Sequence, residues 1–594
     1  MAELAIALGA ILVTGVVLLR PGREGTEAPR SEDAAATTAR SERRMIAVLP
    51  FENLGAPGDA YFAAGITEEI TSRLAVVSGL GVISRDSTRQ YAATEKPTRQ
   101  IGEELGVEYL LGGTVQWARG AAGAERLRIT PRLVRVSDDT QFWSNSYDRV
   151  VDDIFAIQSD IADRVVQALG VNLLQAERQA IIEKPTDNLE AYHVFLRSKE
   201  IVVLSCEDRQ DRIRDLERAV QLDPTFSLAW ATLSTWHSSY YTHCREPTPE
   251  RRALARQDLD QAIRLAPTSV DTLNAAAMFS MQIDKNYDEA LAWIEAAGER
   301  VDGSSKLLTR KAAILRRQGH WVEALDSYKR AFELDPRSVN RVSNLASTYM
   351  WLRQYRGALD YFDRAIALVP AHQFSWYRKA VIPWLWKGDT QASRLVLERV
   401  PDSLDDEGLL RWAWFWQEFY EGKFRAALER LENVPGDWGR SGIEEWPKAL
   451  MAAHAYQYLG DAENARLSYD LARQILEREV ERAPQEAKYH RALAIAYAGL
   501  GRKAEALAAA QAAVEIWPIG REPFFGVANL NNLGLVYTMV GELDLALDTM
   551  ETVLSMPDLI SVPLLELDPR WAPLRSHPRF EDLKAKYGKV ADVL

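Results

Sequence analysis

Small residues recur along this chain at a nearly constant interval, and this repeat constrains the fold more than any other feature of the sequence. Successive positions lie 35, 34, 34, 34, 35, 38, 41 and 40 residues apart. A period near 34 residues is typical of stacked helix–turn–helix units. We therefore predict an all-α array of about ten units over residues 186–556. The recurring residues are Ala255, Ala290, Ala324, Ala358, Ala392, Ala427, Ala465, Ala506 and Ala546.

The clearest repeat indicates two closely packed helices followed by a proline. Alanine at the crossing point lets two helices approach, and proline ends the second helix because it lacks the backbone N–H. The pattern resembles the tetratricopeptide repeat (TPR) family. The resemblance implies a right-handed superhelix whose concave surface binds a protein or peptide. The repeat consists of Leu308, Ala312, Leu315, Gly319, Ala324, Tyr328, Ala331 and Pro336, and the next repeat has the same register.

The inner positions of the first helices are candidates for a binding groove. Counted from the consensus, they run from basic to aromatic, which suits an extended peptide. The alternative is that they are ordinary solvated positions of a scaffold that has no fixed ligand. The candidate groove residues are Lys306, Thr309, Arg316, Arg317, Asn340, Ser343, Trp351, Tyr377 and Trp384.

Residues 45–183 predict a small α/β domain with a mixed sheet. Short β-rich runs alternate with helical periodicity in the order β-α-β-α-β-β-β-α. We expect strands at 46–51, 80–85, 107–116 and 127–136, the last returning as a hairpin, and helices at 63–77, 101–105 and 154–169. Gly112 and Gly113 do not have the spacing of a phosphate-binding loop, and they indicate a bulge or a close backbone approach.

The motifs of this region, IAVLPFENL, YFAAGITEEI, LGVISRDSTRQY and IGEELGVEYLLGGTVQW, closely resemble the TolB amino-terminal-like domain. In such families the domain accompanies TPR repeats in bacterial membrane-anchored regulators. It lies beyond a transmembrane helix, behind a cytoplasmic kinase, cyclase or DNA-binding domain. The resemblance therefore implies a sensor or partner-recognition role outside the inner membrane.

The last segment, residues 557–594, departs from the repeat pattern. It resembles the terminal cap of the same regulator families, and terminal repeats need a cap to cover an exposed apolar face. The motif consists of Asp568, Pro569, Trp571, Leu574, Pro578 and Phe580.

The first residues predict a membrane anchor. Residues 4–19 carry no charge, so residues 2–19 reach the lower length of a membrane-spanning helix, about 17 residues. A cleaved signal peptide is the rival interpretation, although Glu3 stands where a basic region is usual. Residues 20–44 are polar and predict a disordered tether. By the positive-inside rule, the arginines that follow the helix favour a cytoplasmic body. If an upstream domain is missing from this chain, the charges on the other side of the helix are missing too, and the rule is then only half applied.

The two cysteines bear on the compartment. Cys206 and Cys244 are expected near the turns of adjacent repeats, and equivalent turns of stacked repeats lie about 10 Å apart. A loop can close this gap to the Cα separation that a disulfide needs. Disulfides persist in oxidising compartments. With the family resemblance, this favours a single-pass inner-membrane protein with a periplasmic body and a Cys206–Cys244 bridge. Two free thiols in a cytoplasmic protein are the alternative.

The sequence contains no recognisable catalytic motif. It has no H-E-x-x-H, G-x-S-x-G, C-x-x-C or P-loop pattern, so we expect no catalytic residue, cofactor or metal. His237, His243 and Cys244 lie close in sequence but lack further ligands at zinc spacing. Asp59, Glu68 and Glu69 are not interpreted as an acid–base group. We place them in a loop and a first helical turn, where the helix dipole stabilises carboxylates.

Composition narrows the choice of partner. The 71 basic and 84 acidic residues leave a net charge of −13, which disfavours binding to nucleic acid. Two classes of function remain: the partner-binding part of a membrane-tethered regulator, or an assembly scaffold of the cell envelope without a signalling role. The chain could also be the C-terminal part of a kinase or adenylate cyclase whose catalytic domain is absent here.

Overall fold

The computed structural model describes residues 43–588, with short gaps. The gaps are 57–59, 93, 120–124, 151–153, 201–204, 245, 300–303, 402–403, 405–407, 435 and 442–443. The predicted membrane helix at 2–19 and nearly all of the tether lie outside the described residues. Within the described part of the chain, no helix is both long enough and apolar enough to cross a membrane.

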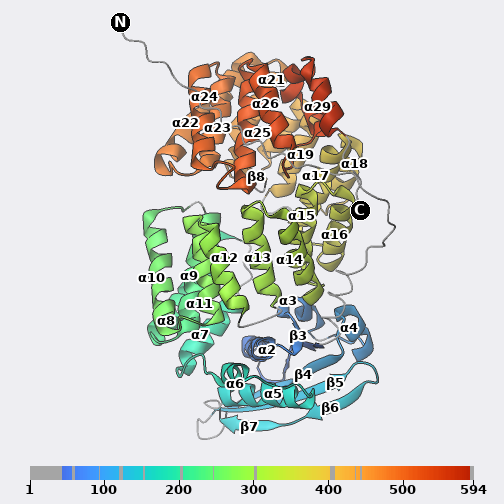
Figure 1. Ribbon diagram of the computed structural model, residues 1–594, viewed down its shortest axis with the longest axis vertical. Coiled ribbons are helices and arrows are strands. Elements are labelled where there is room, and N and C mark those ends of the chain that lie inside the picture. The colour runs from blue at the N-terminus through green and yellow to red at the C-terminus, as the bar shows by residue number, and fades with distance from the viewer. Residues whose placement is uncertain are drawn as a thin grey trace, which may run out of the picture. The chain divides into compact units, whose positions relative to one another are not determined.

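The first described region is a mixed sheet with helices against both faces (Figure 1). Its strand order is β3-β1-β4-β5-β6. β1 is parallel to β3 and β4, whereas β4, β5 and β6 run antiparallel. The strands are β1 Arg44–Val48, β2 Glu52–Asn53, β3 Leu80–Ile83, β4 Tyr109–Arg119, β5 Glu125–Arg135, β6 Thr140–Ser144 and β7 Tyr147–Val150. The helices are α2 Ala60–Ala75, α3 Arg85–Thr88, α4 Thr98–Leu105, α5 Ile154–Ala168 and α6 Gln175–Ile182.

Alternating side chains of β1 divide the core of this sheet between its two faces. Ile46 and Val48 pack with the apolar faces of α2 and α5, while Met45 and Ala47 pack with α4. The predicted strands and helices occur in the predicted order, and β2, α3 and α6 are additional elements that the sequence did not predict. β1 ends earlier than predicted, before Pro50, and the predicted return strand is divided into β6 and β7.

Gly113 allows the close approach that its sequence predicted. A Cβ there would lie 2.5 Å from the Thr130 carbonyl oxygen and 2.7 Å from the Phe51 ring. Any side chain at this position would therefore force β4 away from β5.

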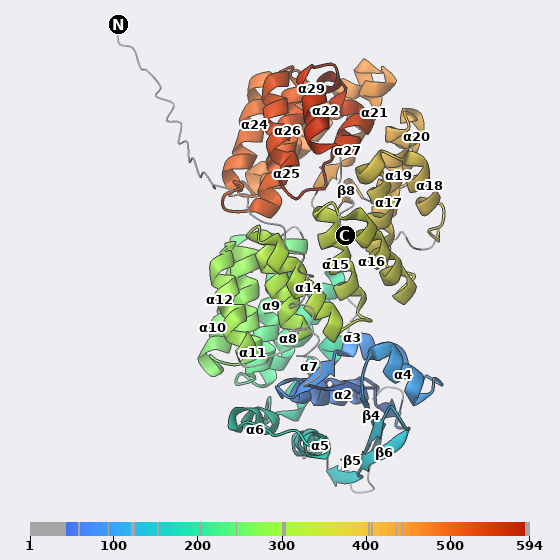
Figure 2. The ribbon, with the colours of Figure 1, turned by 45° about the vertical axis from the view of Figure 1, so that its right-hand side comes forward.

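The rest of the described chain is an array of helix pairs, α7 with α8 through α25 with α26, in which consecutive helices lie side by side (Figure 1 and Figure 2). The helices are α7 Leu189–Glu200, α8 Cys206–Leu222, α9 Ser227–His243, α10 Pro249–Leu265, α11 Val270–Phe279, α12 Tyr287–Gly298, α13 Ser305–Arg317, α14 Trp321–Leu334, α15 Val339–Trp351, α16 Tyr355–Leu368, α17 Gln373–Lys387, α18 Thr390–Leu397, α19 Leu409–Tyr420, α20 Phe424–Glu432, α21 Lys448–Leu459, α22 Ala462–Arg482, α23 Ala487–Gly499, α24 Lys503–Ile516, α25 Pro523–Met539 and α26 Leu543–Leu554.

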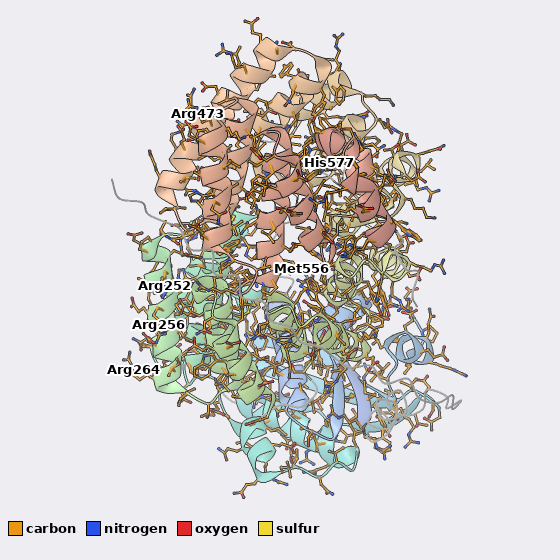
Figure 3. The ribbon with its side chains drawn as sticks, turned by 45° about the horizontal axis from the view of Figure 1, so that its top comes forward. Arg252, Arg256, Arg264, Arg473, Met556 and His577 are labelled. Carbon is orange, nitrogen blue, oxygen red and sulfur yellow. A yellow bond between two sulfur atoms is a disulfide. The ribbon has the colours of Figure 1, made fainter. Side chains whose placement is uncertain are left out.

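The repeated alanines lie where the helices of a pair cross. Eight of the nine are buried, from Ala255 to Ala546, and only Ala392 on the short helix α18 is half-buried. Pro336 and Pro370 each follow the last residue of a second helix by two positions. The exposed side of α10 carries arginines, and Arg252, Arg256 and Arg264 follow one another along this helix (Figure 3).

The sheet region and the first helix pairs share a continuous apolar core. A Cβ on Gly65 of α2 would lie 2.4 Å from the Leu196 side chain of α7, so these two helices are in close contact. Farther along, the hydroxyls of Ser84 and Ser87 donate to the carboxylate of Asp335, which is fully buried after α14. The sheet region is thus attached to the array at two separate places.

The C-terminal segment packs on the last helix pair and also on the middle of the array. It comprises α27 Val562–Leu567, the 3₁₀ turn η6 Pro569–Trp571, α28 Ala572–Arg575 and α29 Arg579–Tyr587. Trp571, Leu574 and Phe580 of the predicted cap motif are buried. The Ser561 hydroxyl donates to the Leu385 carbonyl of α17 at 2.5 Å, and Arg353 donates to the Ile560 carbonyl at 3.1 and 3.2 Å.

One element has no counterpart in the repeat pattern. A short hairpin, β8 Trp438–Ser441 with β9 Glu444–Pro447, stands between α20 and α21. Trp446 of this hairpin is buried and lies 5.9 Å, between ring centroids, from Trp416 of α19.

Candidate functional site

The structure does not form the continuous groove that the sequence predicted. Its middle is filled by α25, which begins some 170 residues farther along the chain than Trp351. Trp351 is only 2% exposed, and its ring centroid lies 4.5 Å from that of Phe524. The guanidinium groups of Arg316 and Arg317 lie 4.9 and 4.7 Å from the centroid of the same ring. These three groove residues therefore stabilise packing within the chain.

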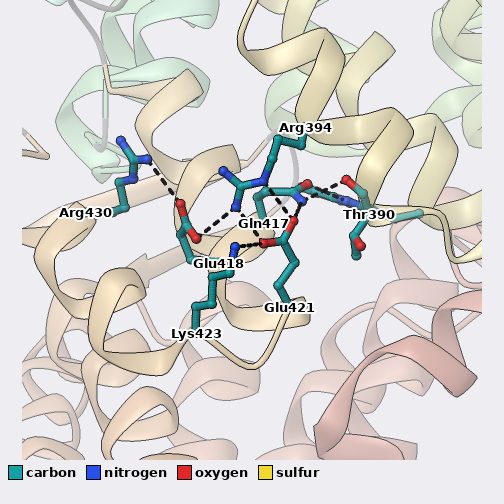
Figure 4. A network of polar contacts seen from close by, with 8 residues as sticks. Thr390, Arg394, Gln417, Glu418, Glu421, Lys423 and Arg430 are labelled. Carbon is teal, nitrogen blue, oxygen red and sulfur yellow. Dashed lines mark hydrogen bonds and ion pairs between the residues drawn. The ribbon is translucent and has the colours of Figure 1, made fainter.

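The aromatic end of the predicted groove is also buried, with Tyr377 and Trp384 at 6% and 3% exposure. The Trp384 indole N–H donates to Gln417 Oε1 at 3.0 Å. Gln417 belongs to a polar network in which Arg394 contacts Glu418 at 2.9 Å and Glu421 at 2.6 Å (Figure 4). Trp384 is consequently held by its neighbours and does not present its N–H to a ligand.

Of the remaining predicted positions, Lys306 and Asn340 are exposed, Thr309 is half-buried and Ser343 is buried. The Thr309 hydroxyl donates to the Ser305 carbonyl, and the Ser343 hydroxyl donates to the Asn340 carbonyl. Both hydroxyls thus bond within their own helix. The basic end of the predicted groove, at Lys306, is the part that opens into a cavity.

This charged cavity has a volume of about 550 Å³. One wall is formed by α2, α3 and α6 Gln175–Ile182 of the sheet region, and the other by α7, α8, α9, α11 and α13 of the array. The side chains that give it its chemistry are Glu68, Glu69, Arg73, Arg85, Lys199, Arg212, Trp236, Asp271, Asn274 and Lys306.

Charges of both signs alternate around the charged cavity. Glu68 contacts Lys199 at 2.9 Å and Arg85 at 2.8 Å. Across the cavity, Lys306 lies 3.8 Å from Asp271. Burial alone would raise the pKa of Glu68, but the two cations hold this pKa at about 2. A carboxylate with so low a pKa stays ionised at neutral pH, and this state favours binding over proton transfer.

Asn274 supplies an unsatisfied hydrogen-bond acceptor in the charged cavity. The side chain is 95% buried on α11, and its Oδ1 atom has no hydrogen-bond partner among the described residues. Buried amide oxygens normally accept a hydrogen bond, because leaving one unpaired costs about 1–3 kcal/mol. Asn274 therefore offers an acceptor for an N–H group of a bound molecule.

Sequence reasoning placed two of these carboxylates incorrectly and missed other residues. Glu68 and Glu69 lie in the second half of α2, not in its first turn, because the helix begins at Ala60. Lys199 and Asn274 occupy inner positions of α7 and α11, where the repeat is degenerate. A complete count of inner positions from the first repeat onward could have found them.

The predicted cysteine pair is brought together by the structure. Cys206 and Cys244 form a disulfide with a Cα separation of 5.6 Å, across the ends of α8 and α9. His243 bonds the Ser239 carbonyl through Nδ1. Burial and Arg251 lower the pKa of His237 to about 4, so this imidazole is neutral. No group of three or more potential metal ligands occurs in the described part of the chain.

Comparison with known proteins gives one relative by sequence. No family model matches the chain. Over 230 residues the chain is 34% identical to a protein named putative adenylate cyclase 3 from Rhizobium meliloti (strain 1021). The match covers 38% of this chain and 37% of that protein, so the chain spans little more than a third of this relative's length.

Among solved structures, similarity is low. Human IFIT1 in a dimer with PPP-AAAA is 16% identical, with 61% of this chain and 78% of that chain covered and a TM-score of 0.33. PilW, a type IV pilus biogenesis factor, is 19% identical, with 38% and 99% covered and a TM-score of 0.30. YrrB, a TPR protein with an unusual peptide-binding site, is 16% identical, with 35% and 98% covered and a TM-score of 0.23. Likeness at this level does not define a function.

Proposed function

We propose that the chain is the partner-recognition part of a membrane-anchored bacterial signalling regulator. It binds a peptide or protein segment and catalyses no reaction itself. The observation that carries this proposal is the charged cavity, in which side chains of the sheet region and of the helix array face one binding space. A bound segment would contact both regions together, and its binding free energy would be coupled to their mutual arrangement.

The chemistry of the charged cavity suits a polypeptide segment. Lys199 and Lys306 offer ammonium groups to acidic side chains, while Asp271 offers a carboxylate to basic ones. The Asn274 amide oxygen would accept a backbone N–H. Trp236, on which the Arg212 guanidinium is stacked at 4.5 Å, adds a flat apolar surface. Mixed charges around an aromatic side chain are typical of protein interfaces.

Two further features support the regulator context. The uncharged run at residues 4–19 supports an anchor over residues 2–19, and the TolB-like and TPR-like motifs support an arrangement with the body in the periplasm. The relative named putative adenylate cyclase 3 favours a cyclase-linked output, supplied by a domain outside the match. An envelope scaffold without signalling is the second candidate, and the exposed Arg252, Arg256 and Arg264 of α10 offer it a surface for protein contacts.

A peptide selection tests the binding proposal. Peptides are selected from a random display library on the full chain in detergent micelles, and their affinities are measured by fluorescence anisotropy. Lys306→Ala should weaken binding about tenfold, which corresponds to about 1.4 kcal/mol. Lys311→Ala is the matched control, because Lys311 lies on the same helix and pairs with Glu295 at 3.0 Å but does not line the charged cavity. Equal affinity for both variants would refute the site.

A further inference from the structure

A second cavity lies among aromatic side chains of the C-terminal half, away from the residues of the charged cavity. This aromatic cavity has a volume of about 170 Å³. Residues of α17, α19, β9, α25, α27 and η6 form its walls. Its aromatic side chains are Tyr377, Trp384, Trp412, Trp416, Tyr420, Trp446 and Trp571.

Four buried polar atoms on the walls of the aromatic cavity have no hydrogen-bond partner within the described ranges. They are the Trp412 Nε1 and Arg570 Nη1 donors and the Asn531 and Asn532 Oδ1 acceptors. Trp412 is 1% exposed and Asn532 is 6% exposed. An unpaired buried polar group is costly, and four around one space are more than packing alone accounts for.

The lining of the aromatic cavity has no net charge. Its only charged side chains are Asp568 and Arg570, which pair with each other at 2.6 and 3.0 Å. A charged ligand would find no counter-charge there and would lose its hydration. The ligand that fits is therefore uncharged.

The volume of the aromatic cavity and the pattern of its unpaired donors and acceptors narrow the class of ligand further. An apolar cavity of about 150 Å³ accommodates benzene, so this one accommodates a single substituted six-membered ring. Hydroxyl groups both donate and accept, so a ring with several hydroxyls can satisfy the indole, the guanidinium and both amide oxygens. The C–H faces of such a ring would pack against the surrounding aromatic rings.

We propose that the aromatic cavity binds an uncharged hydroxylated ring of monosaccharide size, held by Trp412, Asn531, Asn532 and Arg570. This site goes beyond the proposed peptide binding and shares no residue with the charged cavity. It would give the chain a second, small-molecule input.

The test is isothermal titration calorimetry on the full chain in a detergent without a sugar headgroup. The probes are D-glucose, D-galactose, N-acetylglucosamine and myo-inositol, with adenine and uracil as planar heterocycles that also offer donors and acceptors. Saturable binding of at least one of the first four probes at up to millimolar concentration is expected. Binding of none of them, or of the heterocycles alone, would overturn the proposal.

Two asparagines on one helix provide a matched pair of variants. Asn532→Leu removes an unpaired amide and should weaken binding at least about tenfold while leaving the melting temperature unchanged or higher. Asn529→Leu removes an amide that donates to the Ala513 and Trp517 carbonyls and accepts from Arg491, so it should lower the melting temperature but not the affinity. If Asn532→Leu does not fold, Asn531→Leu takes its place. Affinity unaffected by the variant tested would contradict this location.

Discussion

Replacing Phe524 by alanine should open the middle of the predicted groove, which α25 fills. The Phe524 ring is 5% exposed, and its centroid lies 4.5 Å from that of Trp351 and 5.9 Å from that of Trp321. Truncation of a buried phenylalanine costs about 3–5 kcal/mol, and here two stacked guanidinium groups also lose their partner ring. We expect the contact between α25 and the helices α13 and α15 to weaken by at least about 3 kcal/mol.

Hydrogen–deuterium exchange measures this local loss directly, because repeat arrays open in parts and do not unfold in one step. A loss of about 3 kcal/mol should accelerate exchange through local opening about a hundredfold in α13, α15 and α25. Phe142→Ala is the control, since that ring is 40% exposed and its loss should cost much less. Unchanged exchange in α13 and α15 of the Phe524 variant would refute the conclusion that α25 closes the groove.

Three further predictions concern acid stability, the disulfide and the anchor. The folded pKa values of Glu68 and Glu421 are about 2 against an ordinary 4.5, so the stability that these ionised carboxylates contribute is present above pH 4.5 and lost as the pH falls toward 2. Glu421→Gln should therefore make the stability depend less steeply on pH in this range, as measured by acid unfolding followed by circular dichroism. An unchanged acid transition would contradict this. Cys206→Ser should destabilise the pair α8 and α9 by about 4 kcal/mol in the chain-entropy model. Reduction of the wild-type disulfide should accelerate hydrogen–deuterium exchange in α8 and α9 as much as this variant does. Deleting residues 2–19 should move the protein from the membrane fraction to the soluble fraction, and a full chain that is already soluble would disprove the anchor.

The repeat array could be predicted from the sequence because its determinants are local. Alanines at the helix crossings and prolines after the second helices leave a periodic trace, and the buried Ala324 and Ala358 occupy the expected positions. The sheet was predictable for the same reason, since alternation in β1 directs Ile46 and Val48 to one face and Met45 and Ala47 to the other.

Closure of the groove could not be predicted in this way. The contact of Phe524 with Trp351 joins residues far apart in the chain, and a ring exposed at an inner position has the same sequence pattern as one covered by another helix. The same limit applies to the charged cavity. Glu68 and Lys199 meet only because α2 packs on α7, and no spacing in the sequence encodes their contact.

The central claim is that one partner contacts the sheet region and the helix array together at the charged cavity. The most direct measurement is hydrogen–deuterium exchange of the full chain with and without a selected peptide. The account predicts slower exchange in α2 together with α9 and α11, and no change in α22. Protection confined to the array, with α2 unaffected, would contradict a shared site.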